Sequence, residues 1–278
     1  MLAALQIEQR HPRGWRQRIR EQLRPRGEVC SRLVSTPGGH YLQVTAATGR
    51  GGRVDWREVR RVVGGEASRL LYPHRLSPPT DSGVSRFSGN ALRRALMCET
   101  ACHLLRIAPA LARCPVVICD PQARHLPLAE ALVPLAGELR VLTARPDRYR
   151  PAVEAALQRH GAALPLTDDL SCMAGAALVL APDGIDGDPP LPRGWVLSGV
   201  EQARPRTITG YLPADYAAYT PTLPPGCDAW EYLAGLYELS GVTTLGEKPP
   251  LALCAGSRHL TPDALAGQLT GLDSGRAV

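Results

Sequence analysis

Residues 115–125 read PVVICDPQARH, and this stretch decides the fold. Its first five residues form a continuous apolar run, which is typical of a β-strand buried on both faces. A polar turn follows, and residues 125–136 then carry helical spacing, with Pro127 near the start. A buried strand that leads directly into a helix predicts one βα unit of a parallel sheet.

The same alternation of strand and helix extends on both sides of this unit. Gly161 ends one predicted helix as a C-cap, and Pro109 comes just past the end of another. The predicted helices lie at residues 89–107, 125–136, 146–160 and 168–174, and the predicted strands at 68–72, 115–119, 139–143, 163–166, 177–180 and 195–197. We therefore expect an α/β protein with a Rossmann-like, doubly wound and mostly parallel sheet.

The regions at the two ends follow different patterns. Residues 1–53 predict a basic helix at 13–24 and then a hairpin around Pro37-Gly38-Gly39. Residues 54–200 form the expected Rossmann-like domain, which begins with an amphipathic helix at 54–63. Residues 201–278 predict an irregular wrap with one or two helices, at 229–240 and 262–269.

The chain is basic, with a formal net charge of +6, and every basic residue except Lys248 is arginine. A GC-rich bacterial coding sequence would also produce this composition, so a solvated face is expected at 13–24 rather than a nucleic-acid interface. No apolar run approaches the roughly 20 residues that span a bilayer. Because no signal-peptide pattern opens the chain, we expect a cytoplasmic protein without a membrane segment.

Eight cysteines are present, and several lie in apolar segments. Without an export signal, buried free thiols are expected rather than disulfides. The nearest metal-like pattern is Cys98-x3-Cys102-His103, followed by Cys114 and Cys119. It lacks the CxxC spacing of structural zinc sites, so no metal site is predicted.

Polar residues gather where the predicted strands end. In open α/β sheets, ligands bind outside the carboxyl ends of the strands. If the strands are parallel and adjacent, these residues converge at one edge and form a candidate ligand site: Asp120, Arg124, His125, Thr143, Arg145 and Asp183.

Residues 139–145, LRVLTAR, resemble the second strand of NADP-dependent enzymes of the shikimate dehydrogenase type. The resemblance implies that Arg145 and Arg148 hold the phosphate on the ribose of NADP. It departs from the family at residues 120–125, DPQARH, where a GxGxxG turn would let the backbone approach the pyrophosphate. NADP is therefore the candidate cofactor of an oxidoreductase alternative, and the cofactor stays open.

Residues 116–120, VVICD, resemble the first motif of the haloacid dehalogenase superfamily, in which the aspartate is the nucleophile. Residues 142–146 resemble its second motif, and residues 183–188, DGIDGD, its magnesium-holding motif. Gln122 stands where the general acid should be, and Lys248 lies too far downstream to clamp the phosphoryl group. A phosphatase is thus a second enzymatic alternative.

The pattern over residues 54–186 also resembles a set of bacterial Rossmann-like proteins to which no activity is assigned. The matching segments are residues 69–73 (RLLYP), 141–143 (VLT) with Tyr149, 161–162 (GA) and 181–185 (APDGI). This resemblance implies a fold and no reaction. We therefore expect a module that binds a small ligand or a protein partner without standard dinucleotide chemistry, and a homodimer contact through the terminal regions remains open.

Overall fold

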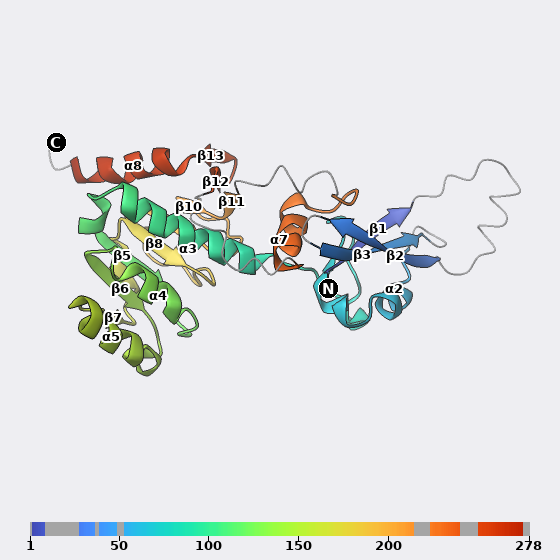
Figure 1. The fold of residues 1–278 in the computed structure, drawn as a ribbon, viewed down its shortest axis with the longest axis horizontal. Helices are drawn as coiled ribbons and strands as arrows, with labels where there is room; N and C mark the ends of the chain where they lie inside the picture. Colours follow the sequence, from blue (N-terminus) through green and yellow to red (C-terminus); the bar gives the residue numbers. More distant parts are fainter. Residues whose placement is uncertain are drawn as a thin grey trace, which may run out of the picture. The chain divides into compact units, whose positions relative to one another are not determined.

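The computed structural model describes residues 2–8, 28–36, 39–48, 53–213, 223–239 and 250–274. The chain divides into two compact units (Figure 1). The first combines Met1–Gly89 with Asp215–Thr243, and the second combines Asn90–Ala214 with Thr244–Val278. Each unit has its own sheet and is described by itself.

The first unit contains a four-stranded sheet of mixed direction. Its strands, in order across the sheet, are β2 (Val29–Thr36), β3 (Gly39–Ala47), β1 (Leu2–Glu8) and β4 (Leu70–Leu71). β2 and β3 form the predicted antiparallel hairpin, whereas β1 runs parallel to both β3 and β4. The parallel pairing buries the apolar residues that open the chain.

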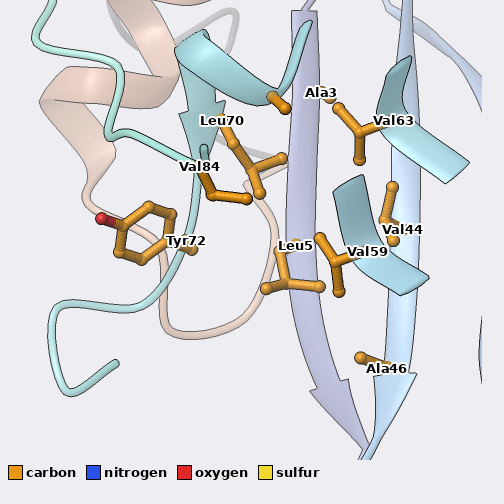
Figure 2. Close-up of a cluster of buried hydrophobic side chains, with 10 residues drawn as sticks. Ala3, Leu5, Val44, Ala46, Val59, Val63, Leu70, Tyr72 and Val84 are labelled. Atoms are coloured by element: carbon orange, nitrogen blue, oxygen red, sulfur yellow. The ribbon is translucent and has the colours of Figure 1, made fainter. Parts of the chain in front are cut away.

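The core of this unit forms where α2 (Trp56–Val63) packs on the sheet. Figure 2 shows Val59 and Val63 of this helix facing Leu5 of β1 and Val44 of β3. The backbone N–H of Glu58 donates to the N-cap Asp55, which fixes where the helix begins. The unit also contains the 3-10 helices η2 (Gly64–Arg69) and η3 (Thr80–Ser82), and the helix α7 (Ala229–Leu239).

The second unit is built on a six-stranded parallel sheet. Its strands, in order across the sheet, are β10 (Thr207–Ile208), β9 (Trp195–Ser198), β8 (Leu178–Ala181), β5 (Pro115–Cys119), β6 (Glu138–Leu142) and β7 (Leu166–Thr167). Every pairing is parallel. The chain starts at β5 near the middle, moves outward through β6 to β7, and returns to β8 on the other side of β5. β8 and β9 are buried throughout, and β5 is nearly so, as the apolar run at 115–119 predicted for β5.

Helices and a small second sheet complete this unit. α3 (Asn90–Ile107) contacts α4 (Leu126–Leu132), α8 (Pro262–Ser274), β9 and β11 (Gly210–Leu212), and α4 packs beside α5 (Pro146–His160). The C-cap of α5 is Gly161 at φ 61°, as predicted. The unit also contains η4 (Leu111–Arg113) and η5 (Leu170–Met173), and the strands β12 (Ala252–Ala255) and β13 (Arg258–Leu260) form an antiparallel sheet with β11.

The expectation for the strand at 68–72 was wrong in one respect. Leu70 and Leu71 pair with Ala3 and Ala4 of β1, so β4 belongs to the first unit and not to the parallel sheet. The helix at 54–63 also belongs to the first unit, because Val59 and Val63 pack on its sheet. The divisions expected at 53/54 and 200/201 therefore do not coincide with those of the two compact units.

Other differences lie at the two ends of the chain. Residues 2–8 form β1, a strand that was not among those predicted from the sequence. From residue 201 onward, the described residues form four short strands besides two helices. The basic helix expected at 13–24 lies outside the described residues. Within the described part of the chain, no helix is both long enough and apolar enough to cross a membrane.

Candidate functional site

All six candidate residues lie at the carboxyl edge of the parallel sheet. β5 is hydrogen-bonded to β6 on one side and to β8 on the other, and all three run in the same direction. Asp120 follows β5, Thr143 follows β6, and Asp183 comes two residues after β8. After β5 the chain adds β6 and β7 on one side of the sheet and then β8 on the other side, so the strand order switches between β5 and β8. Open α/β sheets bind ligands at such a switch point.

Asp120 is buried at the centre of this edge, with 1% of its surface exposed. Its Oδ1 accepts a hydrogen bond of 2.9 Å from the backbone N–H of Arg124, and its Oδ2 accepts one of 2.7 Å from that of His125. The backbone N–H of Ala123, at φ 52°, donates to the Asp120 carbonyl. The loop after β5 therefore wraps around the Asp120 carboxylate, and the carboxylate accepts hydrogen bonds from the backbone N–H groups of this loop.

A third donor reaches this carboxylate from α5. The hydroxyl of the fully buried Tyr149 donates to Oδ2 of Asp120 at 2.7 Å. Burial, together with this hydrogen bond to a carboxylate, raises the pKa of Tyr149 well above its ordinary value. Tyr149 therefore keeps its proton and acts as a permanent donor.

Asp183 forms the second centre of the network. Its Oδ1 lies 2.6 Å from a guanidinium nitrogen of Arg94 in α3, and its Oδ2 lies 3.0 Å from Nε2 of His125. Arg94 also donates to the carbonyl of Pro182 at 3.1 Å. A guanidinium nitrogen of Arg124 is 3.9 Å from Asp183 Oδ2, so two arginines and one histidine surround this carboxylate.

These neighbours set the ionisation of Asp183. Burial acts to raise the pKa of its carboxyl. The hydrogen bond and charge of His125 and the charges of Arg94 and Arg124 outweigh burial, so the pKa of Asp183 lies below its ordinary value. Asp183 is therefore the anion that holds α3 and the loops after β5 and β8 together.

Thr143 and Arg145 lie at the same edge but are separate from this network. The buried Thr143 accepts a hydrogen bond of 3.2 Å at its Oγ1 from the backbone N–H of Arg145, which shapes the start of α5. The side chains of Arg145 and Arg148 are exposed and form no ion pair with any described residue. The structure thus joins Asp120, Arg124, His125 and Asp183 in one network. Arg145 lies at the same edge of the sheet, and its side chain has no ion-pair partner among the described residues.

Two members of this network were missed as site residues in the sequence. Arg94 meets Asp183 across a sequence separation of 89 residues, so no local pattern could indicate the pair. Tyr149 belonged to the resemblance to bacterial Rossmann-like proteins, but that resemblance gave it no role. Its place three residues after Pro146, in the first turn of α5, was the available signal.

The cysteines do not form a metal centre among the described residues. All eight are free thiols, and no group of three or more His, Cys, Asp or Glu side chains there could hold a metal ion. Cys119 lies at the end of β5, where burial raises its pKa to about 12. Cys98 and Cys102 lie one turn apart on α3, and a hydrogen bond from the Cys98 thiol lowers the pKa of Cys102 to about 7.

Comparisons of the chain with protein-family models and with curated proteins found no match. What this edge of the sheet can do therefore has to be derived from its geometry.

Proposed function

We propose that the second unit is a Rossmann-like domain that binds a small phosphorylated molecule at its carboxyl edge, without standard dinucleotide chemistry. Numbered from the first strand along the chain, the sheet order β7-β6-β5-β8-β9-β10 is 3-2-1-4-5-6. This is the order of dinucleotide-binding sheets, whose ligand lies at the switch point between the first and fourth strands. In this chain those strands are β5 and β8.

The position of the Asp120 carboxylate carries the proposal. In a dinucleotide-binding domain, the pyrophosphate accepts hydrogen bonds from backbone N–H groups in the loop after the first strand. Here the N–H groups of Arg124 and His125 already donate to Asp120. A pyrophosphate would have to displace the buried, negatively charged Asp120 carboxylate from these N–H groups. The geometry therefore disfavours NADP binding in the standard manner.

The same contacts disfavour a phosphatase of the haloacid dehalogenase type. Its nucleophilic aspartate needs a free oxygen that faces the phosphorus atom. Both carboxylate oxygens of Asp120 accept hydrogen bonds, from Arg124, His125 and Tyr149, and the residue is almost fully buried. Asp120 therefore organises the loop and does not attack a substrate.

The charges at the rim favour an anionic ligand. Arg124 is 66% exposed and lies at the outer limit of contact with Asp183, while Arg145 and Arg148 stand free of ion pairs to described residues. Arginine binds phosphate through two parallel N–H···O bonds, which gives both affinity and orientation. His125, held by Asp183 through Nε2, adds a polar ring beside these arginines.

Titration calorimetry with inorganic pyrophosphate tests this proposal. We expect binding to the wild type and a weakening of at least fivefold in Arg145→Gln. Arg159→Gln, at the other end of α5, is the matched control and should bind like the wild type. Equal binding by all three proteins, or no binding at all, would overturn the proposal. NADP binding much tighter than pyrophosphate, and lost in Arg145→Gln, would replace it with the oxidoreductase alternative.

A further inference from the structure

A cavity of about 640 Å³ lies in the second unit, away from the six candidate residues. Its walls come from Gly194 and Trp195 at the start of β9, Thr207 at the start of β10, the turn between β12 and β13, and Gln268 of α8. Because β9 and β10 run parallel and both begin here, the cavity opens at the amino edge of the sheet. Its volume falls within the range of about 300–1,000 Å³ that is usual for small-molecule sites.

Arginine dominates the charge of this cavity. Its lining contains Arg193, Arg204, Arg206 and Arg258, and a single acidic residue, Glu201. Among the described residues, Arg204, Arg206 and Arg258 form no ion pair with a carboxylate. The cavity therefore carries an excess of positive charge that the described part of the protein does not neutralise, and a multiply charged anion would supply the missing charge.

Two of these arginines also hold the walls in place. Arg206 adopts φ 53°, a left-handed backbone conformation that is unfavourable for a residue with a side chain. Its guanidinium donates to the carbonyl of Arg193 at 2.9 Å. Arg204 donates to the carbonyl of Ile185 at 3.0 Å. Since these bonds fix the walls before any ligand enters, little reorganisation would be needed on binding.

Arg258 differs from Arg204 and Arg206. It lies in β13 as an exposed residue, and no hydrogen bond occupies its guanidinium within the described structure. It is thus the lining arginine that can contact a ligand without first breaking a structural bond. Gln268, also exposed, adds a neutral polar group from α8.

Part of the remaining wall is apolar. Trp195, Ala203, Pro205 and Ala255 line the cavity between the charged groups. A bare inorganic anion would leave this surface in contact with water, whereas an organic body would cover it. The combination of several arginines and an apolar wall therefore selects an anion that carries an organic group.

We propose that this cavity binds an organic polyphosphate of nucleotide size, at a site separate from the carboxyl edge. The phosphates would contact Arg258 and the neighbouring arginines, and the organic body would lie against the apolar wall. The site shares no residue with the candidate residues at the carboxyl edge, so it stands whether or not a ligand binds there.

Titration calorimetry with ATP in the absence of magnesium tests this site. We expect ATP to bind the wild type and to bind at least tenfold more weakly in Arg258→Gln. Gln268→Glu, which adds a negative charge without changing the side-chain size, should also weaken ATP binding. Arg159→Gln, an exposed position at the end of α5 that belongs to neither proposed site, should bind ATP like the wild type.

Inorganic tripolyphosphate supplies the charge without the organic body, and we expect it to bind at least fivefold more weakly than ATP. Unchanged ATP binding in both Arg258→Gln and Gln268→Glu would overturn the proposal. Tripolyphosphate binding as tight as ATP would refute the part played by the apolar wall. Loss of ATP binding in Arg145→Gln alone would move the ligand to the carboxyl edge and end the proposal of a second site.

Discussion

The hydroxyl of Tyr149 donates a hydrogen bond of 2.7 Å to Oδ2 of Asp120, and so ties α5 to the loop that follows β5. Both residues are buried, and Asp120 receives two further bonds from the backbone of its own loop. The carboxylate therefore serves as an internal anion around which this edge of the sheet is assembled.

Tyr149→Phe should lower the free energy of unfolding by about 1.5–3 kcal/mol, because a buried hydrogen bond to a charged group is lost. Tyr211→Phe is the matched control, since the Tyr211 hydroxyl is equally buried but donates to the neutral carbonyl of Ser198. That change should lower the free energy by only about 0.5–1.5 kcal/mol. Urea unfolding measures both, and an equal loss in the two variants would contradict a charged acceptor at Asp120.

Asp183 should contribute to the acid sensitivity of the second unit. Because its folded-state pKa lies below the ordinary value of 3.8, its contribution to stability is complete above that pH and is lost as the pH falls through the folded-state pKa. Asp183→Asn removes this contribution. The variant should be less stable than the wild type at pH 6, and the difference should shrink on acidification below about pH 4.

Urea unfolding at several values between pH 6 and pH 2.5 measures this difference. Asp188→Asn, at an exposed position without an ion pair to any described residue, is the control and should follow the wild-type curve. A gap between the wild type and Asp183→Asn that stays constant over the whole range would show that His125, Arg94 and Arg124 do not stabilise the charged form of Asp183.

Gly194 should not tolerate a side chain. A Cβ atom there would lie 1.9 Å from the carbonyl oxygen of Ala177, which is backbone and cannot move without breaking the pairing of β8 with β9. Gly194→Ala should cost about 3 kcal/mol or more of stability. Gly175→Ala, where no atom lies within 4 Å of the added Cβ, should be neutral or stabilising by up to about 1 kcal/mol. Thermal unfolding of the two variants checks the contrast, and similar melting temperatures would disprove the close approach.

The parallel sheet could be predicted because its strands are marked by local composition. The run of Val116, Val117 and Ile118 indicated a strand covered on both faces, and the left-handed Gly161 marked the end of α5. β4 could not be assigned to a sheet in this way. It has only two residues, and the sheet it joins depends on its pairing with β1, which lies more than 60 residues earlier.

Part of the candidate site could also be predicted from the sequence. Asp120 and Asp183 were found because each follows a strand that ends at the carboxyl edge. Arg94 was not, because it reaches Asp183 from a helix that precedes the whole sheet. The cavity of arginines was missed as well, since its lining comes from short strands whose pairing is set by contacts distant in sequence.

A crystal structure of the protein soaked in inorganic pyrophosphate tests the central claim most directly. We predict that pyrophosphate binds beside Arg124 and Arg145 at the carboxyl edge, while the Asp120 carboxylate stays on the backbone N–H groups of Arg124 and His125. Pyrophosphate bound to those N–H groups, with Asp120 displaced, would contradict the claim and restore the standard dinucleotide site. A carboxyl edge that holds no pyrophosphate would contradict it equally.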